Sequence, residues 1–246
     1  MKTHTTLVLV SSLVLAAAAN AAVITWSSSL LTGATDVRTN TVNETTVLAW
    51  TAVTSAPTVN GVPFSNSTTQ TISFSSANVG NFGSGTDTSG QLNGVTTIGD
   101  STAYATFLNG STWTAGAANT SPTRTITLSS LTPDQKYEVR LWAADYRTWG
   151  SGRNQTVTSI SGVGTGVIDF NDSPDTNGTT SGGGFVIGVF TADSGGSQSF
   201  TLTGGGAASN GSQAAQVNAI QVVAIPEPSA ALLGGLGMLC LLRRRR

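Results

Sequence analysis

One segment of the chain gathers the aromatic and charged side chains that a sugar-binding site needs. It runs from Trp142 to Asn154 and holds three aromatic residues, and four of the six basic residues in 22–224 lie between Lys136 and Arg153. Flat aromatic rings pack on the C–H faces of sugars, while charged and planar groups hydrogen-bond sugar hydroxyls. The candidate ligand-binding residues are Trp142, Asp145, Tyr146, Arg147, Trp149 and Arg153.

The same segment has a purely structural interpretation. Trp142 then packs in the core, and Trp149 covers the end of a sheet. Asp145 pairs with Arg147 or Arg153 and fixes the loop, so the segment binds no ligand. The sequence leaves both interpretations open.

A second segment, from Asp169 to Gly178, is rich in the oxygen ligands that calcium prefers. Three carboxylates and two amides stand within ten residues, and the candidate metal ligands are Asp169, Asn171, Asp172, Asp175 and Asn177. The segment departs from an EF-hand loop, because Pro174 replaces the sharp-turn glycine and Thr180 replaces the bidentate glutamate. The alternative to a structural calcium ion, and so to any cofactor, is a solvated turn whose side chains cap their own backbone.

The residue types present in the chain exclude several kinds of catalytic and metal sites. The only histidine, His4, and the only cysteine, Cys240, lie near the two ends of the chain. Residues 22–224 therefore cannot form a Ser-His-Asp triad, a Cys-His pair or a histidine-ligated zinc site. They include six basic and eleven acidic residues, and this acidic balance disfavours nucleic-acid binding, which needs a basic surface.

A pair of carboxylates can still cleave a glycosidic bond without histidine. Glu44 and Glu138 are the only glutamates in 22–224, and the polar strand face expected for Glu138 predicts a solvated side chain. We therefore expect no enzymatic activity. A glycosidase or lyase that uses Glu138 or an aspartate of the acidic segment is the alternative.

The elements that must position these residues are predicted to be strands. The chain has 29 glycines and only 9% charged residues, and short β-branched or aromatic runs alternate with clusters of Gly, Asn, Asp and Ser. The predicted strands are 23–26, 45–52, 71–74, 103–108, 124–128, 137–144, 154–160, 184–191, 197–203 and 216–223. This number of strands without an evident linker predicts one all-β domain, a jelly roll or β-sandwich, over residues 22–224.

Two of these strands carry finer signals. On 137–144 the alternating apolar residues from Tyr137 to Ala143 are expected to line one face, with Glu138 and Arg140 on the other. The approach to Tyr137 is similar to a strand entry of fibronectin-like sandwiches, in which a tyrosine hydroxyl closes a corner onto nearby backbone. The segment from Gln216 to Val223 resembles the last strand of galactose-binding-like and malectin-like jelly rolls.

The first 21 residues have the composition of a secretory signal peptide. Lys2 precedes an apolar run from Leu7 to Ala19, which is shorter than the roughly 20 residues that span a bilayer. Ala19 and Ala21 stand at the two positions that signal peptidase reads, so cleavage after Ala21 is expected. The alternative is an uncleaved N-terminal anchor.

Residues 225–246 form a tail in three parts. Pro226, Glu227 and Pro228 precede an apolar run from Ala230 to Leu242, and the chain ends with four arginines. The apolar run predicts a short membrane helix of about 20 Å, and the arginines hold its end on the cytoplasmic side. The tail resembles the PEP-CTERM sorting signal of Gram-negative bacteria. This resemblance implies that the membrane protease exosortase recognises the Pro-Glu-Pro motif.

These observations predict an exported protein of the cell envelope or extracellular matrix, held in the inner membrane by its tail until it is processed. Its expected partners are signal peptidase, exosortase and exopolysaccharide, and its β-sandwich is expected to be a non-catalytic binding module. A glycan-active enzyme and a purely structural surface protein are the alternatives.

Overall fold

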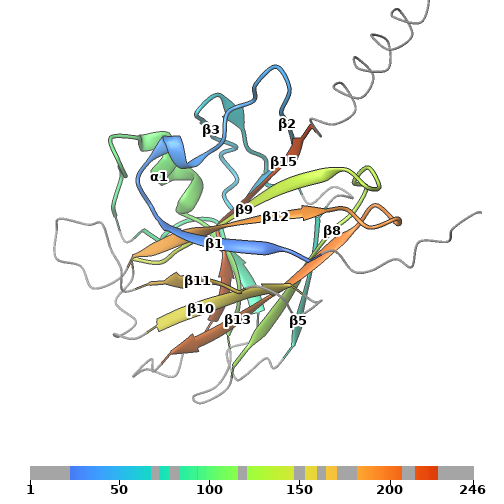
Figure 1. The fold of residues 1–246 in the computed structure, drawn as a ribbon. Coiled ribbons are helices and arrows are strands. Elements are labelled where there is room, and N and C mark those ends of the chain that lie inside the picture. Colours follow the sequence, from blue (N-terminus) through green and yellow to red (C-terminus); the bar gives the residue numbers. More distant parts are fainter. Residues whose placement is uncertain are drawn as a thin grey trace, which may run out of the picture.

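Short strands separated by turns build two facing sheets in this protein. The computed structural model describes residues 23–67, 72–77, 84–92, 94–115, 121–146, 153–159, 165–170, 182–206 and 214–226. Two five-stranded antiparallel sheets, two smaller sheets and a short helix make up these residues (Figure 1). The expectation of an all-β sandwich is confirmed. The signal peptide and all of the tail beyond Pro226 lie outside the described residues.

The two large sheets contain most of the predicted strands. The first sheet has the order β1 (Thr25–Leu30), β12 (Gly183–Thr191), β9 (Lys136–Ala144), β15 (Ala219–Ile225) and β2 (Thr45–Thr51). The second has the order β11 (Thr165–Asp169), β10 (Arg153–Ser159), β13 (Gln198–Gly206), β8 (Thr123–Leu128) and β5 (Ile72–Ala77). The edge strand β11 was not among the predicted strands.

The main core lies between these two sheets. On β9 the predicted alternation is confirmed, because Tyr137, Val139, Leu141 and Ala143 all belong to the buried cluster between the sheets. Phe200 and Leu202 of β13 belong to the same cluster from the second sheet. The predicted corner is also present: the backbone N–H of Thr132 donates to the hydroxyl of Tyr137 over 2.9 Å.

A second core covers part of the outer face of the first sheet. It contains Trp142 of β9 together with side chains from α1 (Thr102–Leu108), β3 (Thr58–Val59) and β4 (Val62–Pro63). The strand predicted for 103–108 is wrong, because this segment is the helix α1, which packs in this core.

The local sequence explains the helix. Ser101 caps its N-terminus, since its side chain accepts a hydrogen bond from the backbone N–H of Tyr104 over 3.1 Å. Tyr104, Phe107 and Leu108 are spaced three and four residues apart, so they share the helix face that is buried.

The strand predicted for 216–223 is divided at Asn218. The part before it is β14 (Ala214–Val217), which pairs with β7 (Ser111–Ala115) in a three-stranded sheet completed by β6 (Ser84–Asp87). The part after it is β15 of the first sheet. The break lets one continuous stretch of chain serve two sheets.

The amide of Asn218 holds this break together. Asn218 is fully buried, and its Nδ2 donates to the carbonyl oxygens of Leu108, over 2.6 Å, and Ala144, over 3.1 Å. Its Oδ1 accepts the backbone N–H of Ala144 over 2.9 Å. One side chain therefore links the end of α1, the end of β9 and the β14–β15 junction.

The chain enters and leaves the sandwich at the same end. Thr25 at the start of β1 pairs with Val189, and Ile225 at the end of β15 pairs with Lys136 at the start of β9. We call this the tail end, because the segment predicted to be a sorting tail, 225–246, starts here.

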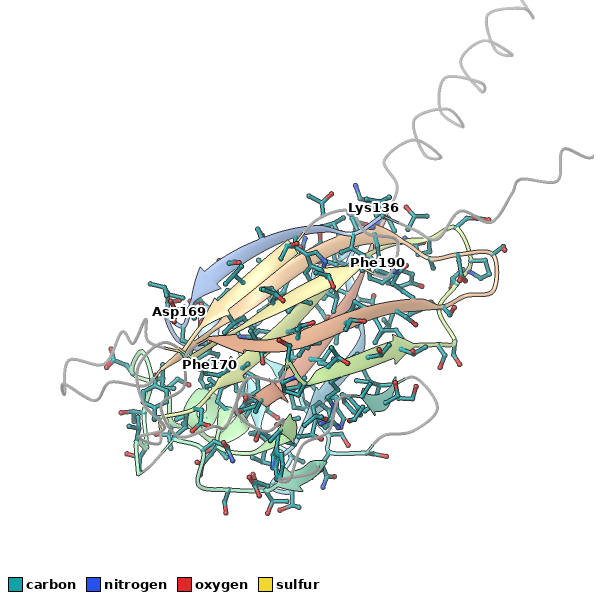
Figure 2. All side chains as sticks on the ribbon, turned by 90° about the horizontal axis from the view of Figure 1, so that it is seen from below. Lys136, Asp169, Phe170 and Phe190 are labelled. Atoms are coloured by element: carbon teal, nitrogen blue, oxygen red, sulfur yellow. The ribbon has the colours of Figure 1, made fainter. Side chains whose placement is uncertain are left out.

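The opposite end of the sandwich is formed by the other ends of the same strands. Leu30 of β1 pairs with Gly184 there, and β11 finishes at Asp169. Figure 2 shows Lys136 at the tail end and Asp169 and Phe170 at this far end.

Candidate functional site

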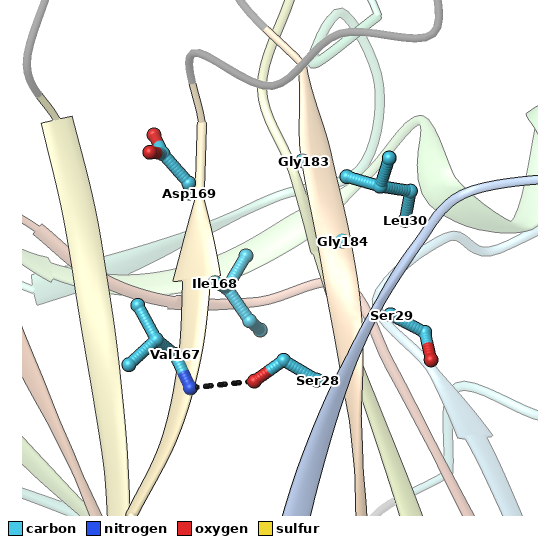
Figure 3. Close-up of a pocket in the computed structure, with 8 residues that line it drawn as sticks. All are labelled: Ser28, Ser29, Leu30, Val167, Ile168, Asp169, Gly183 and Gly184. Atoms are coloured by element: carbon cyan, nitrogen blue, oxygen red, sulfur yellow. Dashed lines mark hydrogen bonds between the residues drawn. The ribbon is translucent and has the colours of Figure 1, made fainter.

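A cleft lies at the far end, between the edge strands β1 and β11. It encloses about 320 Å³. Its lining comes from three strands and consists of Ser28, Ser29, Leu30, Val167, Ile168, Asp169, Gly183 and Gly184 (Figure 3). The cleft is thus built where the two sheets of the sandwich approach each other along one side.

Hydroxyl and glycine residues allow this close approach. The side chain of Ser28 accepts the backbone N–H of Val167 over 2.9 Å, which joins the edges of the two sheets. A Cβ on Gly184 would lie 2.7 Å from the carbonyl oxygen of Ser29. A Cβ on Gly183 would lie 2.2 Å from the carbonyl oxygen of Ala143, so both positions require glycine for the strands to keep their spacing.

The lining combines apolar and polar groups. Leu30 and Val167 are 51% and 44% exposed, which is unusual for large apolar side chains in this protein. The polar lining residues are Ser28, Ser29 and the half-buried Asp169; the Ser28 hydroxyl turns toward β11, whereas the Asp169 carboxylate points away from β1 (Figure 3). A surface that offers both kinds of group is suited to a sugar, which has C–H faces and hydroxyl edges.

The residues of the aromatic segment whose side chains the structure describes are core residues. Trp142, Asp145 and Tyr146 are at most 2% exposed. The Trp142 ring stacks on Phe185 with centroids 5.6 Å apart and meets Phe107 edge-on at 5.5 Å. The structural interpretation therefore holds for Trp142, and no described ring of this segment has a free face for a sugar.

The other candidates of both segments cannot be placed. Arg147 and Trp149 lie outside the described residues, and of Arg153 only the backbone is described. Of the metal candidates, Asp169 ends β11, whereas Asn171, Asp172, Asp175 and Asn177 lie outside the described residues. Within the described ranges, no three His, Cys, Asp or Glu residues group as a metal site. Calcium binding stays a prediction.

Glu138 corrects an expectation, because its side chain is not solvated. It is 7% exposed and forms ion pairs with Arg38 and with Arg140, whose Nε lies 2.7 Å from Glu138 Oε1. Arg38 also pairs with Glu44, and its Nε donates to a Glu44 carboxylate oxygen over 3.1 Å. Both glutamates that could have served a glycosidase are thus held by arginines.

The segment around Arg38 lies over the outer face of the first sheet, which the sequence did not indicate. Gln221 on β15 accepts the backbone N–H of Arg38 over 3.0 Å and donates to its carbonyl over 2.7 Å. Burial opposes the charge of Arg38, but hydrogen bonds and charge attraction from Glu44 and Glu138 outweigh it and raise the pKa of the guanidinium. These polar residues join the segment around Arg38 to the first sheet.

A buried carboxylate and phenol join the helix to the same segment. Asp36, at the end of the short 3₁₀ helix Ala34–Asp36, accepts a hydrogen bond from the hydroxyl of Tyr104 over 2.5 Å and another from the backbone N–H of Thr32 over 2.7 Å. Burial, followed by the charge of Asp36, raises the pKa of Tyr104 well above its ordinary value.

Comparisons with known proteins do not assign this chain to a family. No family model matches the sequence, and no curated protein is significantly similar to it. Among the residues that the structure describes, no helix has the length and apolar character needed to cross a membrane.

Proposed function

We propose that the protein is an exported, exosortase-sorted component of the cell envelope or extracellular matrix. The observation that carries the proposal is the position of the sorting motif. The strand β15 ends at Ile225, and the exposed Pro226 opens the Pro-Glu-Pro motif directly after it. A protease at the membrane surface would meet this motif without unfolding the sandwich.

We further propose that the sandwich is a non-catalytic module that binds exopolysaccharide in the far-end cleft. The mixed lining of the cleft and its place at the opposite end of the sandwich from Lys136, the partner of Ile225, support this assignment, because a ligand site at the far end would stay accessible while the tail is in the membrane. The resemblance of the segment from Gln216 to Val223 to galactose-binding-like jelly rolls favours the same class of ligand. The ion pairs of Glu138 and Glu44 argue against the glycosidase alternative.

Intact mass spectrometry of the protein from its host tests the sorting proposal. The expected mature form begins at Ala22 and has lost the residues after the Pro-Glu-Pro motif. A surface form that still carries the four terminal arginines would overturn the proposal.

A retention assay on immobilised host polysaccharide tests the binding proposal. The full chain should be retained without releasing new reducing ends, whereas shortening of the polysaccharide would support the enzyme. Val167→Glu in the cleft should abolish retention. The matched control is Val47→Glu, because Val47 is also 44% exposed but lies on β2, at the opposite edge of the first sheet from β1. Equal retention of both variants would exclude the cleft.

A further inference from the structure

The arginine on β8 is buried and pairs with no carboxylate of the residues that the structure describes. Arg124 is 6% exposed and points toward the interior from the strand next to the edge strand β5. Its Nη2 donates to the hydroxyl of Thr112 over 2.6 Å, and its Cζ lies 4.8 Å from the centroid of the Phe74 ring. All ion pairs found among the described residues involve Arg38 or Arg140 instead.

Two of the three guanidinium nitrogens have no acceptor. The Nε and Nη1 atoms of Arg124 are inaccessible to solvent and make no hydrogen bond in the structure. Burial lowers the pKa of Arg124 to about 10, so the group still carries its charge at neutral pH. A buried charge without a counter-ion and a buried donor without an acceptor are each costly, and native proteins rarely retain them.

A second unpaired donor lies next to the same aromatic ring. The Trp50 ring packs against Phe74 with centroids 5.0 Å apart, and its buried Nε1 also lacks an acceptor. The neighbouring hydroxyls of Ser76 and Thr114 are paired with each other over 2.5 Å. Arg124 Nε and Nη1 and Trp50 Nε1 are all donors, and such a set calls for an acceptor with negative charge.

We propose that Arg124 anchors a binding site for one small anion, an inorganic ion or a compact carboxylate, between β5, β7 and β8. The anion would accept hydrogen bonds from the free guanidinium N–H groups and neutralise their charge. The β5 strand is an edge of its sheet, so among the described strands no further one closes this side. The site is distinct from the cleft and does not depend on the proposed sorting or glycan binding.

Thermal unfolding of the full chain in detergent tests this site. The probes are chloride, phosphate and acetate, added as sodium salts while a bulky organic sulfonate keeps the ionic strength constant. At least one of them should raise the melting temperature saturably, by several degrees at about a hundredfold excess over its dissociation constant. A response to acetate but not to chloride or phosphate would identify a carboxylate ligand, and the reverse an inorganic ion.

Two variants separate binding from a general effect of salt. Arg124→Met should abolish the shift, whereas Lys136→Met, which removes the same charge from an exposed position, should retain it. Equal shifts in both variants, or no shift with any probe in the parent protein, would overturn the proposal. If Arg124→Met does not fold, chloride NMR on the parent protein decides, because a bound ion broadens the chloride resonance and phosphate or acetate then displaces it, while no broadening and no thermal shift contradict the site.

Discussion

Single residues show both how far the sequence could predict this structure and where it could not. The corner made by Tyr137 follows from local sequence, since its partner Thr132 is five residues away. The environment of Glu138 could not be predicted, because its partner Arg38 is a hundred residues distant and the two meet only when the segment around Arg38 covers the sheet. Contacts between distant residues leave no local pattern.

From the tyrosine corner we predict how much one hydroxyl contributes to the stability of the protein. Tyr137→Phe keeps the ring that stacks on Phe190 with centroids 5.7 Å apart, and it removes only the acceptor for the Thr132 N–H. The free energy of unfolding should fall by about 1 kcal/mol, as for an ordinary hydrogen bond. Urea denaturation measures this loss. An unchanged midpoint would mean that the hydroxyl does not hold the corner.

The raised pKa of Tyr104 predicts that the protein loses stability at alkaline pH. Its pKa is raised in the folded state, so the folded protein favours the protonated form. Its contribution is complete below the ordinary tyrosine pKa of about 10 and declines as the pH rises above that value. Tyr104→Phe should lower stability at pH 8 by about 1.5–3 kcal/mol, because the Asp36 carboxylate loses a donor.

This pH dependence is tested by comparing the stability of the parent protein with that of Tyr104→Phe at alkaline pH. Stability of Tyr104→Phe should fall less steeply than that of the parent protein between about pH 10 and 11, since other titrating groups are common to both. Parallel curves across this range would contradict the raised pKa of Tyr104.

At the scale of elements, strand prediction succeeded for most strands of the two large sheets but missed β11, in which every second residue is also buried. The alternation on β9 is clear because its inner face meets the second sheet. Prediction failed at α1, where a serine cap and helical spacing were the available signals, and at the short strands β3, β4 and β6, which have too few residues to show a period. The division of the last predicted strand was hidden because its apolar residues continue on both sides of Asn218.

The contacts of Asn218 at this break predict that the stability of the fold depends strongly on one buried side-chain amide. Asn218→Ala would remove the side-chain partners of the Leu108 carbonyl and of the Ala144 N–H, whereas the Ala144 carbonyl would keep its hydrogen bond from Gln216 Nε2. The free energy of unfolding should fall by about 2–4 kcal/mol, since several buried groups lose their hydrogen bonds together. Asn40→Ala is the control, because exposed Asn40 makes one hydrogen bond, to the N–H of Thr46. Similar denaturation midpoints for the two variants would rule out this role for Asn218.

At the scale of the whole molecule, the proposed sorting tail gives the sandwich a direction, which is its orientation relative to the membrane. Four residues, Pro226 to Ser229, separate the end of β15 from the apolar run that begins at Ala230. Four extended residues span at most about 14 Å. While the tail is in the membrane, the tail end of the sandwich must therefore lie next to the bilayer and the far-end cleft must face away from it.

This direction predicts which exposed residues approach lipid before processing. Val42 is 101% exposed in the turn before β2, whose first residue, Thr45, pairs with Ala224 at the tail end. Leu30 is exposed at the far end. In unprocessed protein with Cys240→Ser, reconstituted in liposomes, a fluorophore on Val42→Cys should be quenched by a quencher attached to lipid head groups. A fluorophore on Leu30→Cys should be quenched little. Equal quenching at the two positions would show that the sandwich has no fixed direction, and stronger quenching at Leu30→Cys would place the cleft against the membrane.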